Sequence, residues 1–333
     1  MSTFIYQGGL RFVGRSGVGQ AIAHQKEALR RVGEEVETRP SPSTRIVHIN
    51  TVFPDSLLTV LCARMNGWKV VYYAHSTMED FRGSFPLSNV LAPLFRCYLR
   101  LCYNLGDIVV TPTDYSKRII SGYGIRRPIR ALSNGVDTSR FRRDEARGLE
   151  WRRRWGLGED DKVVVTAAVP IERKGILDFI ALARKMEKVR FIWFGSLPKS
   201  LIPRAVRRAM AEAPSNVSFP GFVSQEELVA AYSGADCFLF LSREETEGIA
   251  VLEALSCGIP AVLRSIPAYG TLERDGLSCC LFSTDEALEE AVERVLSGQV
   301  DGLCEKEIAV AAKRDILQVG LALREIHRSL ETV

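Results

Sequence analysis

The chain has 333 residues, of which 46% are hydrophobic and 25% charged, as is ordinary for a globular protein long enough for two domains. No run of 18 or more apolar residues occurs, and the first residues lack the apolar core of a signal peptide, so we expect neither a spanning helix nor a cleaved leader. The net charge of +4 is uneven, because residues 1–150 hold 21 Lys and Arg against 13 Asp and Glu, whereas residues 151–333 hold 23 against 27. This unevenness is either ordinary scatter or a basic first domain that faces an anionic partner such as a membrane surface or a polyphosphate.

Strand and helix patterns alternate along the first half. Apolar runs predict strands over 3–7, 45–50, 69–75 and 107–113, and helical spacing predicts helices over 19–33, 56–67 and 114–124. The apolar segment 87–106 carries Arg96 and Arg100 and is compatible with a core helix or with an amphipathic helix at a membrane interface.

The alternation is clearer in the second half. Strands are predicted over 162–169, 189–195, 217–222, 237–242 and 259–264, and helices over 174–186, 201–212, 224–234, 248–258 and 283–296. This order is typical of a parallel sheet with crossover helices on both faces. Because the polar, charged segment 138–158 separates the halves, we predict an α/β fold with two domains across a cleft, over 1–150 and 151–310. A C-terminal helix within 311–333 is expected to pack back on the first domain.

Cysteine and histidine spacing gives no sign of a metal site. None of the eight cysteines forms a Cys-x-x-Cys pair, and the four histidines lack metal-ligand spacing. Because most cysteines lie in apolar runs, we expect buried, reduced thiols in a cytosolic protein, with neither a metal nor a cofactor.

The segment EETEGIAVLEALSCGIP, residues 244–260, sets three glutamates beside a strongly apolar stretch. Burial of an unpaired carboxylate is costly, so these side chains require partners. The preceding loop follows a predicted strand, where ligands of parallel sheets bind, and the next helix directs its N-terminus to that point, which suits a diphosphate. Carboxylates accept hydrogen bonds from hydroxyl groups. The pattern therefore favours a nucleotide sugar, with one glutamate for the sugar and one for the ribose.

Glu245 and Glu253 resemble the Glu-x7-Glu motif of the retaining family 4 glycosyltransferases, which have the GT-B fold of two Rossmann-like domains. The continuation ALSCGIP and the segment LSNGVDTSRF at 132–141 are similar to that family as well, and the resemblance extends from SGVG at 16–19 to the helix at 283–296. The common loop reads Glu-Gly-Phe-Gly, whereas this chain has Glu-Thr-Glu-Gly. That variant, with IERKGILDF at 171–179 and AHSTMEDFRGSF at 74–85, resembles the diacylglycerol glucosyltransferases.

The resemblance implies roles for residues of the second domain. Arg173 and Lys174 would neutralise the negative charge of the departing diphosphate. Many members of the family place an Arg near position 168, where this chain has Ala168. Either Arg173 supplies part of that positive charge here, or the diphosphate is held more weakly. Glu245 would hold the donor sugar, and Glu253 the ribose. The backbone N–H groups of Gly248 and Ile249 would hold the phosphate or sugar, while Glu247 faces the acceptor or solvent.

Residues of the first domain receive their expected roles in the same way. His75 would lie in the cleft near the anomeric carbon, or else be a core histidine. Asp80 is a weaker candidate on the acceptor side. Gly17 and Gly19 would let the backbone approach the phosphate, or serve only a turn. Gly14-x-x-Gly17-x-Gly19 is neither a dinucleotide fingerprint nor a Walker loop, which makes an NAD-dependent oxidoreductase a poor alternative.

We therefore predict a retaining hexosyltransferase that moves glucose from a UDP-sugar to a hydroxyl acceptor, with a lipid such as diacylglycerol as the candidate. Its partners would be the nucleotide sugar, the acceptor and a membrane surface on the cytosolic face, and no nucleic acid. The alternative is a nucleotide-sugar epimerase or a catalytically silent sugar-nucleotide-binding protein of the same fold. Glu245→Ala or Glu253→Ala is expected to reduce transfer far more than folding.

Overall fold

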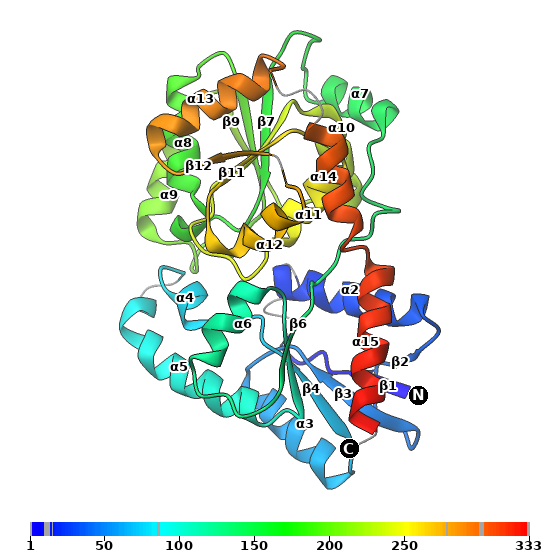
Figure 1. The fold of residues 1–333 in the computed structure, drawn as a ribbon. Helices are drawn as coiled ribbons and strands as arrows, with labels where there is room; N and C mark the ends of the chain where they lie inside the picture. The colour runs from blue at the N-terminus through cyan, green and yellow to red at the C-terminus, as the bar shows by residue number, and fades with distance from the viewer. Residues whose placement is uncertain are drawn as a thin grey trace.

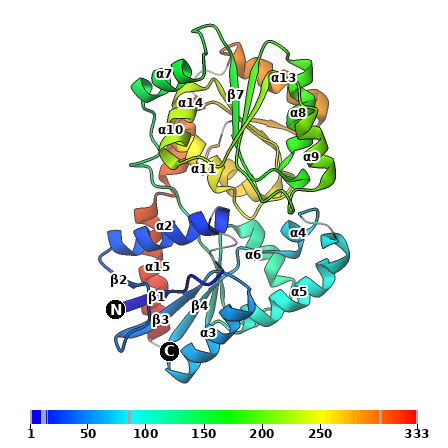
Figure 2. The ribbon, with the colours of Figure 1, turned by 180° about the vertical axis from the view of Figure 1, so that it is seen from behind.

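The chain folds into two α/β domains. The computed structural model describes residues 2–9, 14, 16–84, 87–277, 279–299 and 303–331. Figures 1 and 2 show the domains from opposite sides, the first domain below and the second above, with the chain crossing between them twice. The prediction of two layered α/β domains is confirmed.

A six-stranded parallel sheet forms the centre of the first domain, in the order β2-β1-β3-β4-β5-β6. Its strands are β1 (Ser2–Ile5), β2 (Glu35–Glu37), β3 (Thr44–Ile49), β4 (Lys69–Tyr73), β5 (Ile108–Thr111) and β6 (Ile129–Ala131). The helices are α2 (Gly17–Arg31), α3 (Pro54–Met65), α4 (Met78–Phe81), α5 (Ser88–Asn104) and α6 (Asp114–Ser121). Helix α2 covers one face of the sheet, and α3, α5 and α6 cover the other. Each face has its own apolar core, formed between the sheet and these helices.

The second domain repeats this layering with the strand order β9-β8-β7-β10-β11-β12. Its strands are β7 (Val163–Ala167), β8 (Arg190–Phe194), β9 (Val217–Gly221), β10 (Cys237–Phe240), β11 (Ala261–Arg264) and β12 (Cys280–Phe282). The helices are α7 (Glu145–Arg154), α8 (Ile176–Lys185), α9 (Arg204–Ala211), α10 (Gln225–Gly234), α11 (Ile249–Ser256), α12 (Gly270–Arg274), α13 (Asp285–Leu296) and α14 (Leu303–Ala312), and the short 3₁₀ turns are Glu172–Lys174 and Pro267–Tyr269. Strands β7, β8 and β10 are almost wholly buried, as the apolar runs at 162–169, 189–195 and 237–242 predict.

The last helix, α15 (Ile316–Glu331), returns to the first domain and packs against α2. A Cβ on Gly320 would lie 2.2 Å from the carbonyl oxygen of Ala28, so only glycine allows this close crossing. The two chain crossings also pair with each other, because Val136 N–H donates to Arg314 O (2.9 Å) and Ile316 N–H donates to Val136 O (3.0 Å). The domains are thus joined by a paired double hinge.

Two further expectations bear on the surface. Helix α5 contributes to the core through Leu99, Cys102 and Tyr103, while other apolar side chains of it face outward; the predicted location at a membrane interface stays a prediction. Most of the described cysteines are buried, but Cys62 and Cys97 are exposed. None of the helices described is long and apolar enough to span a bilayer.

Candidate active site

The site lies where the strand order of the second sheet reverses. Strand β7 is flanked by β8 on one side and β10 on the other, so the connections after β7 and β10 leave in opposite directions and open a crevice between them. Lys174 follows β7 and Glu245 follows β10. Two segments 71 residues apart in the sequence therefore meet at one point.

Lys174 Nζ forms an ion pair with Glu245 Oε1; the Glu245 side chain is buried, and that of Lys174 is 15% exposed. Burial alone would raise the pKa of Glu245, but Lys174 and then Arg173 outweigh it and hold that pKa below its ordinary value. The carboxylate is therefore ionised at neutral pH, and the partner required of this buried acid is Lys174.

Arg173 reaches from the second domain to the first. Its guanidinium forms an ion pair with Asp80 (2.7 Å), donates to Ser84 Oγ (3.2 Å), and also donates to the backbone oxygen of Glu244. Asp80 and Ser84 lie in and just after α4. The cation predicted for the diphosphate is thus held by a carboxylate across the domain interface, and this contact places Asp80 at that interface.

Helix α11 begins beside the same loop. Gly248 precedes its first residue, Ile249, with φ of +89°, a left-handed conformation that glycine adopts readily. The first N–H groups of a helix have no partner within it, and they lie at its positive end. This end of α11 is placed to accept an anion between the two strand ends.

Glu253 lines a cavity of about 210 Å³ that extends from α11 to the first domain. Gly17 and Ile249 line it too, as does Ala168, whereas His75, Lys174 and Glu245 are outside its lining. Burial raises the pKa of Glu253 to about 8. A buried carboxyl group that no described side chain neutralises thus faces a cavity that both domains line. We call this space the donor cavity, after the role that the sequence analysis predicts for Glu253.

The two predicted glycines of the first domain differ in their surroundings. A Cβ on Gly17 would meet nothing within 4 Å, so this position is open toward the donor cavity. A Cβ on Gly19 would lie 2.3 Å from the backbone oxygen of Gly14. Gly19 of α2 is therefore required for packing against the preceding segment at Gly14, and Gly17 is the one that leaves space for a ligand.

His75 lies just beyond the end of β4 and is buried. Asn50 Oδ1 accepts from Gln25 Nε2 (2.6 Å) and lies 2.8 Å from His75 Nε2, and the imidazole stacks on Tyr73. Because an amide oxygen only accepts, this contact places the proton of His75 on Nε2 and leaves Nδ1 with a lone pair. Burial lowers the pKa of His75 to about 4, so the ring is neutral at pH 7.

Glu247 does not face solvent, one of the two alternatives left by the sequence. It is buried at the domain interface, where its Oε2 accepts from the backbone N–H of Asn134 (2.9 Å). Burial raises the pKa of Glu247 to about 7 against the opposing hydrogen bonds from Ser133 and Asn134. The sequence analysis did not predict this contact, although it had singled out the segment 132–141, which contains Asn134, for its resemblance to the family.

Glu244 makes a second contact between the loop after β10 and the first domain, and no sequence pattern predicted it. Tyr115 of α6 donates its hydroxyl to both carboxylate oxygens of Glu244, at 3.0 Å each. Burial raises the pKa of Glu244 to about 7. The loop from Arg243 to Gly248 is therefore part of both the site and the domain interface.

Comparison with known proteins identifies the family. A profile described as "Glycosyl transferases group 1" matches residues 149–314, and one described as "Glycosyltransferase Family 4" matches residues 11–140. A processive diacylglycerol alpha-glucosyltransferase of Acholeplasma laidlawii is 34% identical over 99% of this chain and 98% of its own. The chain belongs to the family 4 glycosyltransferases.

Other relatives of this glycosyltransferase are more distant. The alpha-galactosylglucosyldiacylglycerol synthase of Streptococcus pneumoniae is 26% identical over 80% of this chain and 71% of its own. Among solved structures, sucrose-phosphate synthase from Thermosynechococcus elongatus has a TM-score of 0.82 at 16% identity and covers 99% of both chains. Anabaena HepE in complex with UDP-glucose has a TM-score of 0.74 at 17% identity over 100% of this chain and 99% of its own. These likenesses confirm the GT-B fold.

Proposed function

We propose that this glycosyltransferase moves glucose from UDP-glucose to the hydroxyl group of a diacylglycerol-type lipid, with retention at the anomeric carbon. The observation that carries the proposal is the meeting of Lys174, Glu245 and the start of α11 at the switch point of the second sheet, next to a cavity that Glu253 lines. The Acholeplasma relative, named as an alpha-glucosyltransferase of diacylglycerol, supports the choice of sugar and acceptor. The Anabaena structure with UDP-glucose supports the choice of nucleotide.

The donor would extend along α11. Its ribose hydroxyls would donate to Glu253 in the donor cavity, its diphosphate would lie at the N-terminus of α11, and its sugar hydroxyls would donate to Glu245. As the glycosidic bond breaks, negative charge grows on the diphosphate, and Lys174 and Arg173 are the nearby cations that can stabilise it. Because Arg173 is held by Asp80 without a ligand, it would exchange that carboxylate for the diphosphate.

His75 would act as a neutral group beside the reacting centre. With its proton on Nε2, its Nδ1 can accept a hydrogen bond from a sugar or acceptor hydroxyl. No covalent intermediate on the protein is proposed; the acceptor would approach on the face that the diphosphate leaves, and the departing phosphate oxygen would accept the acceptor's proton.

An exposed apolar surface on the first domain supports a lipid acceptor. Helices α3 and α5 share the core on one face of the sheet and are joined where Arg64 donates to Leu105 O (2.7 Å). Both helices leave large apolar side chains in solvent: Leu58, Leu61, Met65, Val90, Leu91, Leu94 and Leu101. A groove of about 630 Å³ beside them is lined by Arg100, Arg126 and Arg127. We call α3, α5 and this groove the apolar-basic surface, and we propose that it docks on a bilayer containing anionic lipids.

The activity is tested by incubating the purified chain with UDP-, GDP- and ADP-sugars and diacylglycerol in mixed micelles. We expect one glucolipid product, from UDP-glucose, with an α-linkage visible in the anomeric proton coupling. A β-linked product would remove the retaining assignment. Conversion of UDP-glucose to a different UDP-sugar without lipid product would instead identify an epimerase.

Membrane docking is tested separately by sedimentation with phosphatidylglycerol vesicles. Val90 and Leu94 are 74% and 69% exposed, so Val90→Asp with Leu94→Asp leaves the core intact and is expected to abolish vesicle binding. Leu149 on α7 of the second domain is 57% exposed, and Leu149→Asp is the matched control that keeps binding. Equal binding by the double variant and the control would refute docking through α5.

A further inference from the structure

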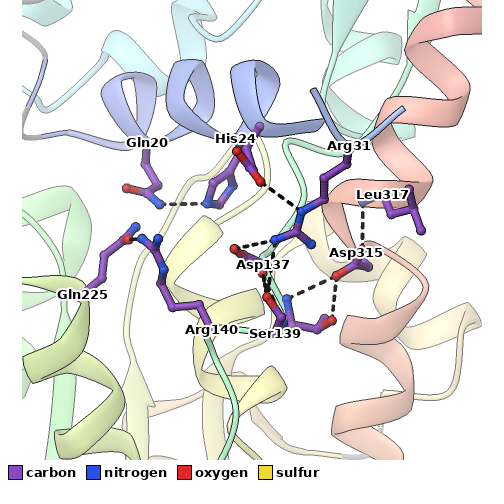
Figure 3. A network of polar contacts seen from close by, with 11 residues as sticks. Gln20, His24, Arg31, Asp137, Ser139, Arg140, Gln225, Asp315 and Leu317 are labelled. Atoms are coloured by element: carbon purple, nitrogen blue, oxygen red, sulfur yellow. Dashed lines mark hydrogen bonds and ion pairs between the residues drawn. The ribbon is translucent and has the colours of Figure 1, made fainter. Parts of the chain in front are cut away.

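A second cavity lies on the hinge side of the domain interface. It has a volume of about 730 Å³ and is lined by α2, by residues 137–147 after the first chain crossing, and by α10. Gln20 and Gln225 line both this space and the donor cavity, so the two adjoin there. Figure 3 shows Gln20, His24 and Arg31 of α2 facing Asp137, Ser139 and Arg140. We call this space the hinge cavity.

Charge in the hinge cavity is unbalanced. Its lining holds six Lys or Arg side chains and four Asp or Glu side chains. Three of the acids are already held: Arg31 pairs with Glu27 (3.2 Å) and Asp137 (2.9 Å), and Arg147 pairs with Asp144 (3.3 Å). Arg31 and Arg147 therefore have acidic partners, which leaves the other four Lys and Arg side chains of the lining.

None of those four cations forms an ion pair with a described residue: Lys26, Arg30, Arg140 and Arg142. Glu226, the fourth acid of the lining, interacts with Arg140 only through its longer-range charge. The side chain of Arg140 donates to the amide oxygen of Gln225, on α10 of the other domain. Lys26 and Arg30 lie one helical turn apart, where like charges repel. Burial and then the nearby charge of Arg30 lower the pKa of Lys26. Such a cluster is stabilised when an anion enters it.

We propose that the hinge cavity binds a small, soluble anion carrying phosphate groups, which bridges α2 and the segment 140–142. Only Ala23, Val229 and Ile316 give the lining apolar contact, so it suits a charged ligand better than an acyl chain. Helix α2 also lies on the opposite face of the first sheet from the apolar-basic surface, so a headgroup in a bilayer docked there does not reach the hinge cavity.

Such a ligand would favour domain closure, because it contacts a helix of the first domain and side chains that reach α10 of the second. A ligand that binds the closed state better shifts the population toward it. The donor cavity is also lined by both domains, so occupancy of the hinge cavity is expected to tighten donor binding.

The test is calorimetric titration of the full chain with inorganic pyrophosphate, with and without saturating UDP, which blocks the donor cavity. We expect pyrophosphate to bind in the presence of UDP, and Arg30→Gln with Arg142→Gln to weaken that binding at least about tenfold, since two charge-assisted contacts are lost. Arg39→Gln with Arg204→Gln is the matched control, because both arginines are exposed, unpaired by any described residue and outside the cavity, and it should bind like the wild type. Arg30→Lys with Arg142→Lys should restore most of the affinity.

Several results would overturn the proposal. The first is that UDP completely prevents pyrophosphate from binding. The second is that the matched control weakens pyrophosphate binding as much as the Arg30 and Arg142 variant does. The third is that pyrophosphate does not bind at all. Binding of phosphatidylglycerol vesicles, but not of pyrophosphate, that depends on Arg30 and Arg142 would assign the cavity to lipid headgroups and refute a soluble ligand. If UDP does not bind but pyrophosphate does, with the expected loss in the Gln variants, the donor assignment fails while the hinge-cavity proposal stands.

Discussion

Glu253 allows a sharp test of the proposed donor orientation. Burial raises the pKa of this carboxyl group to about 8, so only roughly a tenth of it is ionised at pH 7. Ribose hydroxyls donate hydrogen bonds, and an ionised carboxylate accepts them more strongly than a neutral one. Donor binding should therefore favour the ionised form and release close to one proton at pH 7.

The size of the effect follows from the ionised fraction. Between pH 6 and pH 8 this fraction rises from roughly 1% to roughly 50%, so the Kd for UDP-glucose should fall by about 50-fold and then level off. Calorimetry in buffers of different ionisation enthalpy measures both the Kd and the released proton. Glu253→Gln should bind with a nearly flat pH profile. Glu244 and Glu247, whose pKa values also lie near 7, remain in that variant, so the difference between the two profiles isolates Glu253. A wild-type profile as flat as that of the variant would refute the orientation.

The same shift predicts an opposite effect on stability. The folded pKa of about 8 lies above the ordinary value of 4.5, so the folded state keeps a proton that the unfolded state loses between these pH values. Wild-type stability should therefore fall as pH rises from about 4.5 to about 8, by up to about 5 kcal/mol at roughly 1.4 kcal/mol per pH unit. Glu253→Gln escapes this loss, so it should be more stable than the wild type at pH 8 while binding donor less well. Lower stability of the variant at pH 8 would show that Glu253 is stabilised by contacts rather than strained by burial.

Three further changes test the rest of the site. Lys174→Met should destabilise the fold by about 3–5 kcal/mol, because it leaves Glu245 charged and buried, and adding Glu245→Gln should recover most of that loss in urea unfolding while activity stays absent. It follows that Glu245→Ala affects folding as well as transfer. Asp80→Asn should tighten UDP-glucose binding a few-fold by freeing Arg173; weaker binding would mean that their ion pair holds the donor-competent state. Gly19→Ala should lower the melting temperature, since its Cβ would clash with the backbone of Gly14, and an unchanged value would show that this loop yields.

The sequence predicted the main strands and the local setting of the donor residues well. Buried parallel strands are short apolar runs, and Glu245 and Lys174 each follow such a run, so local pattern placed both at strand ends. Their pairing required one more fact, that β7 and β10 are neighbours although β8 and β9 come between them in the chain. Local periodicity does not encode strand order, and here the resemblance to a known fold supplied it.

The shortest strands and the contacts between the domains could not be predicted from the sequence, for different reasons. Strands β2, β6 and β12 have three residues each and lie at or next to sheet edges, too short for a periodic signal. The partners of Glu247 and Asp80 are in the opposite domain, at Asn134 and Arg173. Such contacts depend on how two separately folding units sit against each other, which neither unit's own pattern specifies.

The loop after β10 links donor binding to the arrangement of the domains. Tyr115 donates to Glu244, Thr113 donates its hydroxyl to Thr246 O (2.8 Å), and Asn134 donates its N–H to Glu247, so contacts from the segments after two neighbouring strands of the first domain, β5 and β6, fall on this one loop. Any ligand that fixes this loop also acts on these contacts. Since coupling between two equilibria is reciprocal, a closed interface must tighten donor binding by the same factor by which donor binding favours closure. Thr246 and Glu247, the two residues at which this loop differs from the common Glu-Gly-Phe-Gly, thus connect the second domain to the first.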